Sequence, residues 1–155
     1  MELKDEKRYA PIIIPTLCRY EHLKECIESL ARCKQAEKTR LYISLDYPAS
    51  EKHVEGWKRI SEYLQDGIQG FEKVVCFYQK ENLGALANEM FLIEEAYKEY
   101  DRYIFTEDDN VFAPAAIEYW NKILDEYEND EKVIAVCAKS FPEYNHEADD
   151  NIFML

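Results

Sequence analysis

Glycine and positive charge are both scarce in this sequence. Of its 155 residues only 4 are glycine, and 19 lysines and arginines face 32 aspartates and glutamates, for a formal net charge of -13. Nucleic acids and anionic membranes are bound by clustered basic surfaces, so this charge balance argues against both as partners. An anionic ligand would need local help from a metal ion or from a few well-placed cations.

Long apolar runs and paired cysteine motifs are missing as well. No stretch reaches the length of a membrane-spanning helix, and the charged segment 1–8 does not resemble a signal peptide. The five cysteines are an odd number and lack metal-type spacing, which indicates reduced thiols. We therefore predict a cytoplasmic protein without a membrane span. The cysteines expected to pack in the core are Cys26, Cys33, Cys76 and Cys137.

What the sequence does contain is a regular alternation of short apolar runs and amphipathic segments. With 155 residues and 47% apolar content, the chain is long enough for one domain with a real core. The alternation predicts a three-layer α/β/α fold with a mostly parallel, Rossmann-like sheet and right-handed crossovers. Strands are expected at 10–17, 41–45, 73–78, 103–106 and 133–137, and helices at about 21–33, 54–64, 86–97 and 117–127.

Two of these segments carry more detailed expectations. The apolar run 10–17 suits a central strand covered on both faces, and Pro15 is expected to end its hydrogen-bond ladder. In the helix at 86–97 the apolar positions at helical spacing are Leu86, Met90, Ile93 and Tyr97, which predicts the buried face.

Three consecutive carboxylates, Glu107, Asp108 and Asp109, follow the predicted strand at 103–106. In so acidic a chain a run of three is expected roughly once by chance, so the run alone carries no information. Its position is informative, because a buried strand precedes it and Pro114 lies near the start of the next helix. Ligands of open parallel sheets bind at the carboxyl ends of the strands, so this turn is a candidate cation site. Strand alternation would place Glu107 and Asp109 on one side and Asp108 on the other.

Other polar residues follow the remaining strands. The loop after the first strand carries Thr16 and Arg19, and the second strand ends at Asp46. Gly84 precedes the third helix, where a glycine would let backbone N–H groups approach a phosphate. An equally simple interpretation is that Gly84 only permits a turn.

Taken together, Pro-Thr-Leu-Cys-Arg19, Asp46, the Glu81–Asn88 segment and Glu107–Asp109 resemble the glycosyltransferases of the GT-A fold. The Asn-x-Gly-x-x-x-Asn part of the third motif resembles the family-2 enzymes. The segment Thr-Glu-Asp-Asp-Asn-Val-Phe-Ala-Pro is similar to that of N-acetylglucosaminyltransferase I, whose Glu-Asp-Asp triplet binds the metal. The resemblance covers roughly residues 9–140.

This resemblance implies a role for each matching residue. Thr16 and Arg19 would lie beside the nucleotide, Asp46 on the base and Glu107 towards the ribose, while Asp109 would bind Mn²⁺ or Mg²⁺. The implied partners are a nucleoside-diphosphate sugar, with a uridine donor favoured, and a saccharide or other hydroxyl acceptor. The implied nucleotide-binding set is Pro15, Thr16, Arg19, Asp46, Asn82, Gly84, Asn88, Glu107 and Asp108.

The resemblance also implies that something is missing. In these families the general base and much of the acceptor pocket follow the fifth strand, and little such chain remains here. We therefore expect residues 1–155 to form a single GT-A-like nucleotide-sugar-binding domain that lacks the C-terminal acceptor-binding part. No local pattern identifies a general base among Glu143, Glu147, Asp149 and Asp150.

Two other functions stay open. One is a nucleotide-binding module without turnover, because the chain is truncated. The other is a nucleotidyltransferase, which would normally carry a glycine-rich loop with basic residues after the first strand, whereas the segment from Pro15 to Arg19 contains no glycine.

Overall fold

The computed structural model describes residues 9–137. The four candidates for a general base between Glu143 and Asp150 lie outside the described residues. Contacts divide the chain into two compact units, residues 1–121 and 122–155, and each is described by itself. The first unit holds the sheet, the implied nucleotide-binding residues and Asp109.

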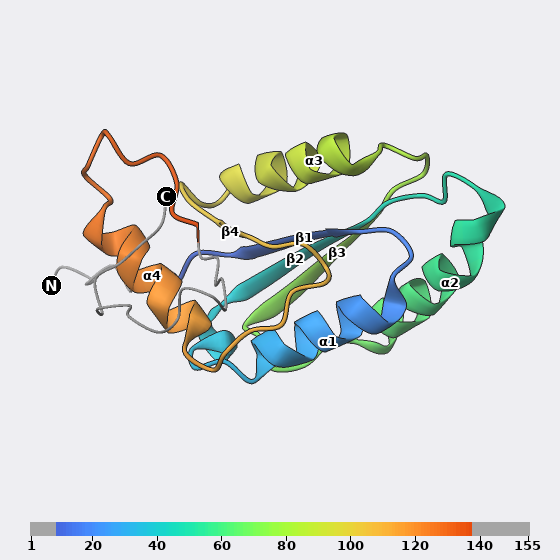
Figure 1. The fold of residues 1–155 in the computed structure, drawn as a ribbon, viewed down its shortest axis with the longest axis horizontal. Helices are drawn as coiled ribbons and strands as arrows, with labels where there is room; N and C mark the ends of the chain where they lie inside the picture. Colours follow the sequence, from blue (N-terminus) through green and yellow to red (C-terminus); the bar gives the residue numbers. More distant parts are fainter. Residues whose placement is uncertain (1–8, 138–155) are drawn as a thin grey trace, which may run out of the picture. The chain divides into compact units, whose positions relative to one another are not determined.

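The first unit is built on a four-stranded parallel sheet, which confirms the predicted α/β class (Figure 1). The strands are β1 (Ile12–Thr16), β2 (Arg40–Leu45), β3 (Lys73–Tyr78) and β4 (Ile104–Phe105), in the spatial order β3-β2-β1-β4. β1 therefore occupies an interior position, as its apolar sequence predicts. Its three isoleucines, Ile12 to Ile14, are fully buried, because the sheet is covered on both faces.

Helices form the two outer layers. α1 (Tyr20–Ala31) and α2 (Glu51–Asp66) cover one face of the sheet, and α3 (Ala85–Tyr97) covers the other (Figure 1). A short 3₁₀ turn at Ala36–Lys38 precedes β2. α4 (Ala116–Glu126) begins two residues after Pro114 and runs across the boundary between the two units.

Pro15 does not end the ladder of β1, so that prediction was wrong. β1 continues to Thr16, whose carbonyl accepts from the N–H of Asp46 at 2.9 Å. In a parallel strand alternate residues bond to opposite neighbours, and Ile13 bonds towards β4 through Thr106 N–H. Pro15 faces that same side, where β4 has already ended at Phe105. Its missing N–H therefore costs no ladder hydrogen bond.

The buried face of α3 also differs from the prediction. Leu86, Met90 and Tyr97 are 73%, 46% and 54% exposed, whereas the buried residues are Asn88, Leu92 and Ala96. Leu92 and Ala96 pack with Ile13 and Tyr42 in a core cluster, to which Ile93 is a partly buried addition. The helix is thus turned by roughly a third of a revolution from the expected orientation.

The predicted strand at 133–137 is absent, since these residues form no strand in the described chain. Ile134 is 99% exposed and Cys137 is exposed, so the expectation of a buried Cys137 was also wrong. A strand is stable only when a neighbour pairs with it, and apolar composition alone does not supply that neighbour. Of the other cysteines, Cys26 and Cys33 are buried as predicted and Cys76 is half-buried.

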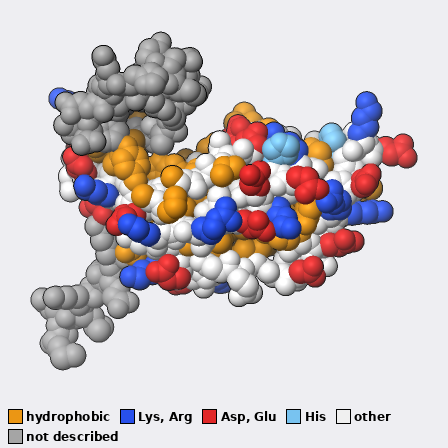
Figure 2. Space-filling view, turned by 60° about the horizontal axis from the view of Figure 1, so that its bottom comes forward, with side chains coloured by type: hydrophobic (Ala, Val, Ile, Leu, Met, Phe, Trp, Pro, Cys, Tyr) orange, Lys and Arg blue, Asp and Glu red, His pale blue; other side chains and the backbone are white. Residues whose placement is uncertain are grey.

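One face of the molecule shows how the charged side chains are distributed. Acidic and basic side chains are interspersed on the face shown in Figure 2. Within residues 9–137 no helix is both long and apolar enough to cross a membrane.

Candidate functional site

The loops that carry the candidate residues leave the same edge of the sheet. β1, β2 and β4 run parallel, so their carboxyl ends meet at one edge, and Thr16, Asp46 and the turn at 107–109 lie there. β1 and β2 are neighbours, and the bond from Asp46 N–H to Thr16 O links their ends directly. This is the edge at which open parallel sheets bind their ligands.

The first group at this edge is the Arg19 network, formed by Thr16, Arg19, Asp108 and Asp109. One guanidinium nitrogen of Arg19 bonds to Asp108, and another donates to Asp109 Oδ2 at 2.8 Å. The hydroxyl of Thr16 donates to the other oxygen of Asp108 at 2.7 Å. The side chain of Asp108 is buried, and that of Asp109 is one third exposed. Arg19 therefore bridges one buried carboxylate and one that solvent can reach.

Burial and charge set the ionisation of two groups in this region. Burial lowers the pKa of Arg19, but Asp108 and Asp109 outweigh it and hold the pKa above its ordinary value. Burial, with a smaller contribution from the same two carboxylates, raises the pKa of Cys26 to about 12. Arg19 is therefore charged and Cys26 a neutral thiol at physiological pH. The Cys26 Sγ lies 3.7 Å from the carbonyl oxygen of Glu107, below the turn.

Strand alternation does not continue through the acidic turn, which corrects the expected placement of its side chains. β4 ends at Phe105, and Asp108 and Asp109 lie in a turn from which both reach Arg19. Glu107 is exposed, and the two bonds of Arg19 to this turn go to Asp108 and Asp109 instead. A turn of this kind places consecutive side chains on one side, which a strand cannot do.

The metal expected at this turn was tested against the chemistry of the available ligands. Within residues 9–137 no group of three or more His, Cys, Asp or Glu side chains is placed to hold a metal ion. Mg²⁺ and Mn²⁺ commonly take only one or two carboxylates together with substrate phosphates. Asp109, accessible at the sheet edge, fits that simpler arrangement, in which the substrate completes the coordination.

The second group is the Asp46 network. The Asp46 carboxylate is almost fully buried and receives four hydrogen bonds, which is the full acceptor capacity of the group. The donors are the backbone N–H groups of Tyr47 at 2.9 Å, Leu83 at 2.8 Å and Gly84 at 3.0 Å, and the side-chain amide of Asn82 at 3.2 Å. Asp46 thereby holds the loop that leads from β3 into α3.

Gly84 lies at the start of α3 in a conformation that favours glycine. Its φ is +79°, a region that residues with a Cβ rarely adopt, and a Cβ built there would meet nothing within 4 Å. The positive φ accounts for a glycine here, and the open space beside it is compatible with both interpretations of Gly84.

Asn88 is placed inside the fold. It is 2% exposed, accepts from the Ser44 hydroxyl and donates to the Ser44 carbonyl at 3.1 Å. Gln79 donates to the same hydroxyl at 3.0 Å. These bonds explain the orientation of α3, because a buried amide must be satisfied and only the sheet offers Asn88 its partners.

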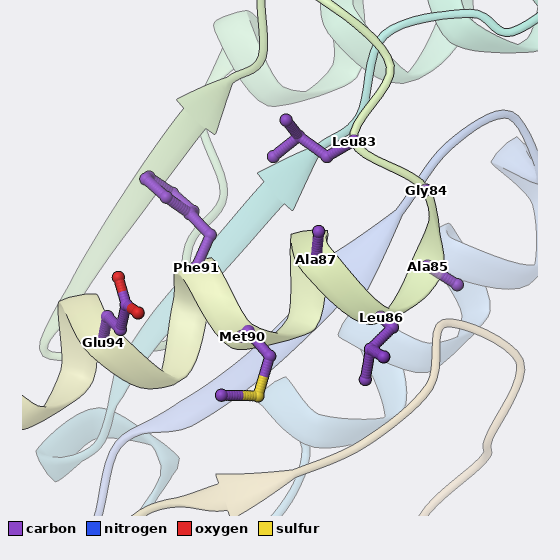
Figure 3. A pocket seen from close by; sticks show the side chains of 8 residues that line it. All are labelled: Leu83, Gly84, Ala85, Leu86, Ala87, Met90, Phe91 and Glu94. Atoms are coloured by element: carbon purple, nitrogen blue, oxygen red, sulfur yellow. The ribbon is translucent and has the colours of Figure 1, made fainter.

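An open groove of about 700 Å³ lies along the start of α3 (Figure 3). Its lining is mostly apolar and includes Leu83, Gly84, Leu86, Met90 and Phe91, with Glu94 at its rim. No member of the Arg19 network lines it, so it is separate from the acidic turn.

Gly56 of α2 is a site-supporting residue that the motif analysis did not identify. A Cβ at this position would lie 2.0 Å from the carbonyl oxygen of Cys18, in the loop that carries Arg19. The only signal in the sequence is a glycine inside an otherwise regular helical pattern, which often marks close packing.

We expect Gly56→Ala to destabilise the protein by about 1–3 kcal/mol, because relieving the overlap must move the loop or the helix. Alanine favours helix over glycine by about 1 kcal/mol, so a net loss would show that the overlap dominates. Thermal unfolding measures the effect, and Glu55→Ala on the exposed side of the same helix is the control. A Gly56→Ala protein as stable as the native chain would contradict the packing role.

Comparisons with known proteins support the fold class. No protein-family model and no curated protein matches the sequence. The architecture, a parallel sheet flanked by helices, is an α/β fold similar to the GT-A type. The solved structures that are similar to this chain include two crystal structures of S. aureus TarS, with TM-scores of 0.52 and 0.51 and 16% sequence identity in both. Each match covers 76% of this chain. The chain corresponds to 20% of the length of one TarS chain and 32% of the TarS 1–349 chain.

Proposed function

We propose that this chain is the donor-binding part of a metal-dependent glycosyltransferase. Such an enzyme moves a sugar from a nucleoside diphosphate, here a uridine diphosphate by preference, to a hydroxyl group of a saccharide or another acceptor. The observation that carries the proposal is the Arg19 network, which places one guanidinium and one accessible carboxylate at the ligand-binding edge of a GT-A-like sheet.

The fold supports the class of reaction. TarS, whose structure this chain resembles in part, is a glycosyltransferase of the GT-A fold. Fold alone does not define an activity, so the proposal depends on the residues at the sheet edge. These include the only motif, Glu107–Asp109, for which the sequence resemblance implies metal binding.

Each residue in the proposal has a chemical role that its position allows. Arg19 would bind the diphosphate, since a planar guanidinium forms paired hydrogen bonds with phosphate oxygens. Glu107, exposed in the turn, would accept from the ribose. Asp46 would contact the base, which requires the base to displace one of the four donors that already bond to its buried carboxylate. Asp109 would hold the Mn²⁺ or Mg²⁺ ion. When bound, that ion would neutralise charge on the diphosphate as it leaves.

A second candidate is a nucleotide-binding module without turnover. It is favoured by the coverage of the TarS chains, of which this sequence spans 20% and 32%. Both candidates predict nucleotide binding, and turnover distinguishes them. Sugar transfer or donor hydrolysis by this chain would support the enzyme, and turnover only in a longer chain would support the module.

We expect UDP to raise the unfolding temperature of this chain when Mn²⁺ is present. A ligand at 100 times its Kd stabilises the native state by about 2.7 kcal/mol, which corresponds to a shift of about 5–10 °C for a chain of this size. Thermal unfolding with UDP, GDP, dTDP and CDP, each with and without Mn²⁺, is the measurement.

A Mn²⁺-dependent shift that is largest for UDP would support the donor site and the preferred base. The same shift with all four nucleotides would support a diphosphate site that does not select the base. Absence of a shift with every pair would contradict the proposed function.

A further inference from the structure

We propose that Arg19 is an exchangeable counter-ion that keeps a divalent cation off Asp109 until a diphosphate is present. The inference rests on the proposed function and adds a specific consequence: cation and nucleoside diphosphate bind this site cooperatively, and Arg19 sets the size of that cooperativity.

The first step is the geometry of the shared guanidinium. Arg19 uses one nitrogen for Asp108 and another for Asp109, at 2.8 Å from Oδ2. Asp108 has a second fixed partner in Thr16 and is 4% exposed, so its position is determined by the fold. Asp109 is 33% exposed and Arg19 is 48% exposed. The contact to Asp109 is therefore the one that solvent and ligands can reach and exchange.

The second step is charge. A cation on Asp109 would meet the guanidinium at hydrogen-bond distance from the same carboxylate, and like charges so close oppose binding. Within the described residues no set of three His, Cys, Asp or Glu ligands is placed to compensate for this repulsion. A divalent ion alone should therefore bind weakly to the free protein.

The third step is the alternative partner that a diphosphate supplies. The diphosphate oxygens can accept paired, charge-assisted hydrogen bonds from the guanidinium, and these bonds are at least as strong as the one to Asp109. The same oxygens provide the ligands that an Mg²⁺ or Mn²⁺ ion needs beyond one carboxylate. Movement of Arg19 to the diphosphate would then release Asp109 to the cation. Because such coupling is reciprocal, the cation must strengthen nucleotide binding by the same factor.

The test measures Mn²⁺ binding directly, through the loss of the electron paramagnetic resonance signal of free Mn²⁺, with and without UDP. For the native chain we expect UDP to raise Mn²⁺ affinity by about tenfold or more, within the usual range of coupling between sites. For Arg19→Gln we expect Mn²⁺ alone to bind about tenfold more tightly than it does to the native chain, and the UDP effect to fall to about threefold or less.

Arg59→Gln is the matched control. Arg59 is also 48% exposed and also pairs with a carboxylate, that of Glu21 at 2.6 Å, but it belongs to α2 and not to the acidic turn. Its Mn²⁺ affinity should equal that of the native chain. Arg19→Lys keeps one charge but cannot bridge two carboxylates, so it should lie between the native chain and Arg19→Gln; it replaces Arg19→Gln if that variant fails to fold.

The outcomes separate the two proposals. An unchanged affinity for Mn²⁺ alone in both Arg19 variants would overturn the counter-ion role, even if UDP still binds. Failure of the native chain to bind UDP in the presence of Mn²⁺ would overturn the proposed function. An undiminished UDP effect in Arg19→Gln would overturn the claim that Arg19 sets the coupling.

Discussion

The variant Asp109→Asn is expected to lose Mn²⁺-dependent nucleotide binding while keeping its fold. Asparagine has nearly the same shape but no charge, and Asp109 is the accessible carboxylate of the Arg19 network, since Asp108 is buried. Loss of a residue that only supports a metal ligand typically costs 10–100-fold in affinity, so loss of the ligand itself should cost about 100-fold or more. Isothermal titration of UDP in the presence of Mn²⁺ measures the effect.

Stability should change little in the same variant. The Arg19–Asp109 pair is substantially exposed, and such pairs contribute about 0–1 kcal/mol. Asp101→Asn, which removes a charge from an 85% exposed side chain, is the control for net charge. Native affinity for UDP in Asp109→Asn, at saturating Mn²⁺, would exclude Asp109 as the metal ligand.

The two aspartates of the Arg19 network have different positions, which explains why Asp109→Asn should lose nucleotide binding but keep its stability. Asp108 is buried, with both oxygens engaged by Thr16 and Arg19, so it anchors the turn to the β1 loop. Asp109 is the more exposed end of the same arrangement, and in our proposal it exchanges Arg19 for a cation. The acidic turn thus contains one buried carboxylate, Asp108, and one solvent-accessible carboxylate, Asp109, to which we assign the cation.

The order and class of the main elements could be predicted from the sequence. The four strands of the sheet and the helices between them follow directly from short apolar runs that alternate with helical periodicity. β1 is interior because a continuous apolar run requires cover on both faces. The pattern of apolar residues was sufficient to predict a strand or helix wherever that pattern determines which side chains are buried.

The failures occurred where pairing or polar contacts decide the structure. The face of α3 is set by Asn88, whose buried hydrogen bonds to Ser44 outweigh the apolar residues Leu86 and Met90. The segment 133–137 has strand composition but no strand structure. Local periodicity shows neither the hydrogen-bond partner of Asn88 nor whether a neighbouring strand is available to pair with residues 133–137. Both depend on parts of the chain that are distant in sequence.

In the candidate site, too, the sequence predicted which residues follow the strand ends but not which of them bond to one another. It did not predict the two groups that they form, Arg19 with the acidic turn and Asn82 with Asp46. Sequence alone did not reveal that Arg19 binds both aspartates, because the turn geometry replaces strand alternation there. It also gave no indication that Gly56 supports the loop from the neighbouring helix.

Asp46→Ala is expected to destabilise the protein by about 2–4 kcal/mol, even without any ligand. Hydrogen bonds to a charged acceptor contribute about 1.5–3 kcal/mol each, but the four are not additive and water can replace part of them at the half-buried loop. The corresponding fall in Tm is about 5–15 °C. Thermal unfolding measures it, with Glu81→Ala, an exposed carboxylate in the same loop, as the control.

This variant also distinguishes the two roles considered for Asp46. A base contact predicts that uridine and UDP are weakened by the same factor, because the contact ignores the phosphates. Holding the loop predicts a loss of stability without ligand, since the N–H groups of Leu83 and Gly84 lose their acceptor. With all four acceptor positions already occupied, a base could reach the carboxylate only by displacing one of these donors. Native stability with weakened uridine binding would therefore show that such displacement occurs and would contradict the loop-holding role.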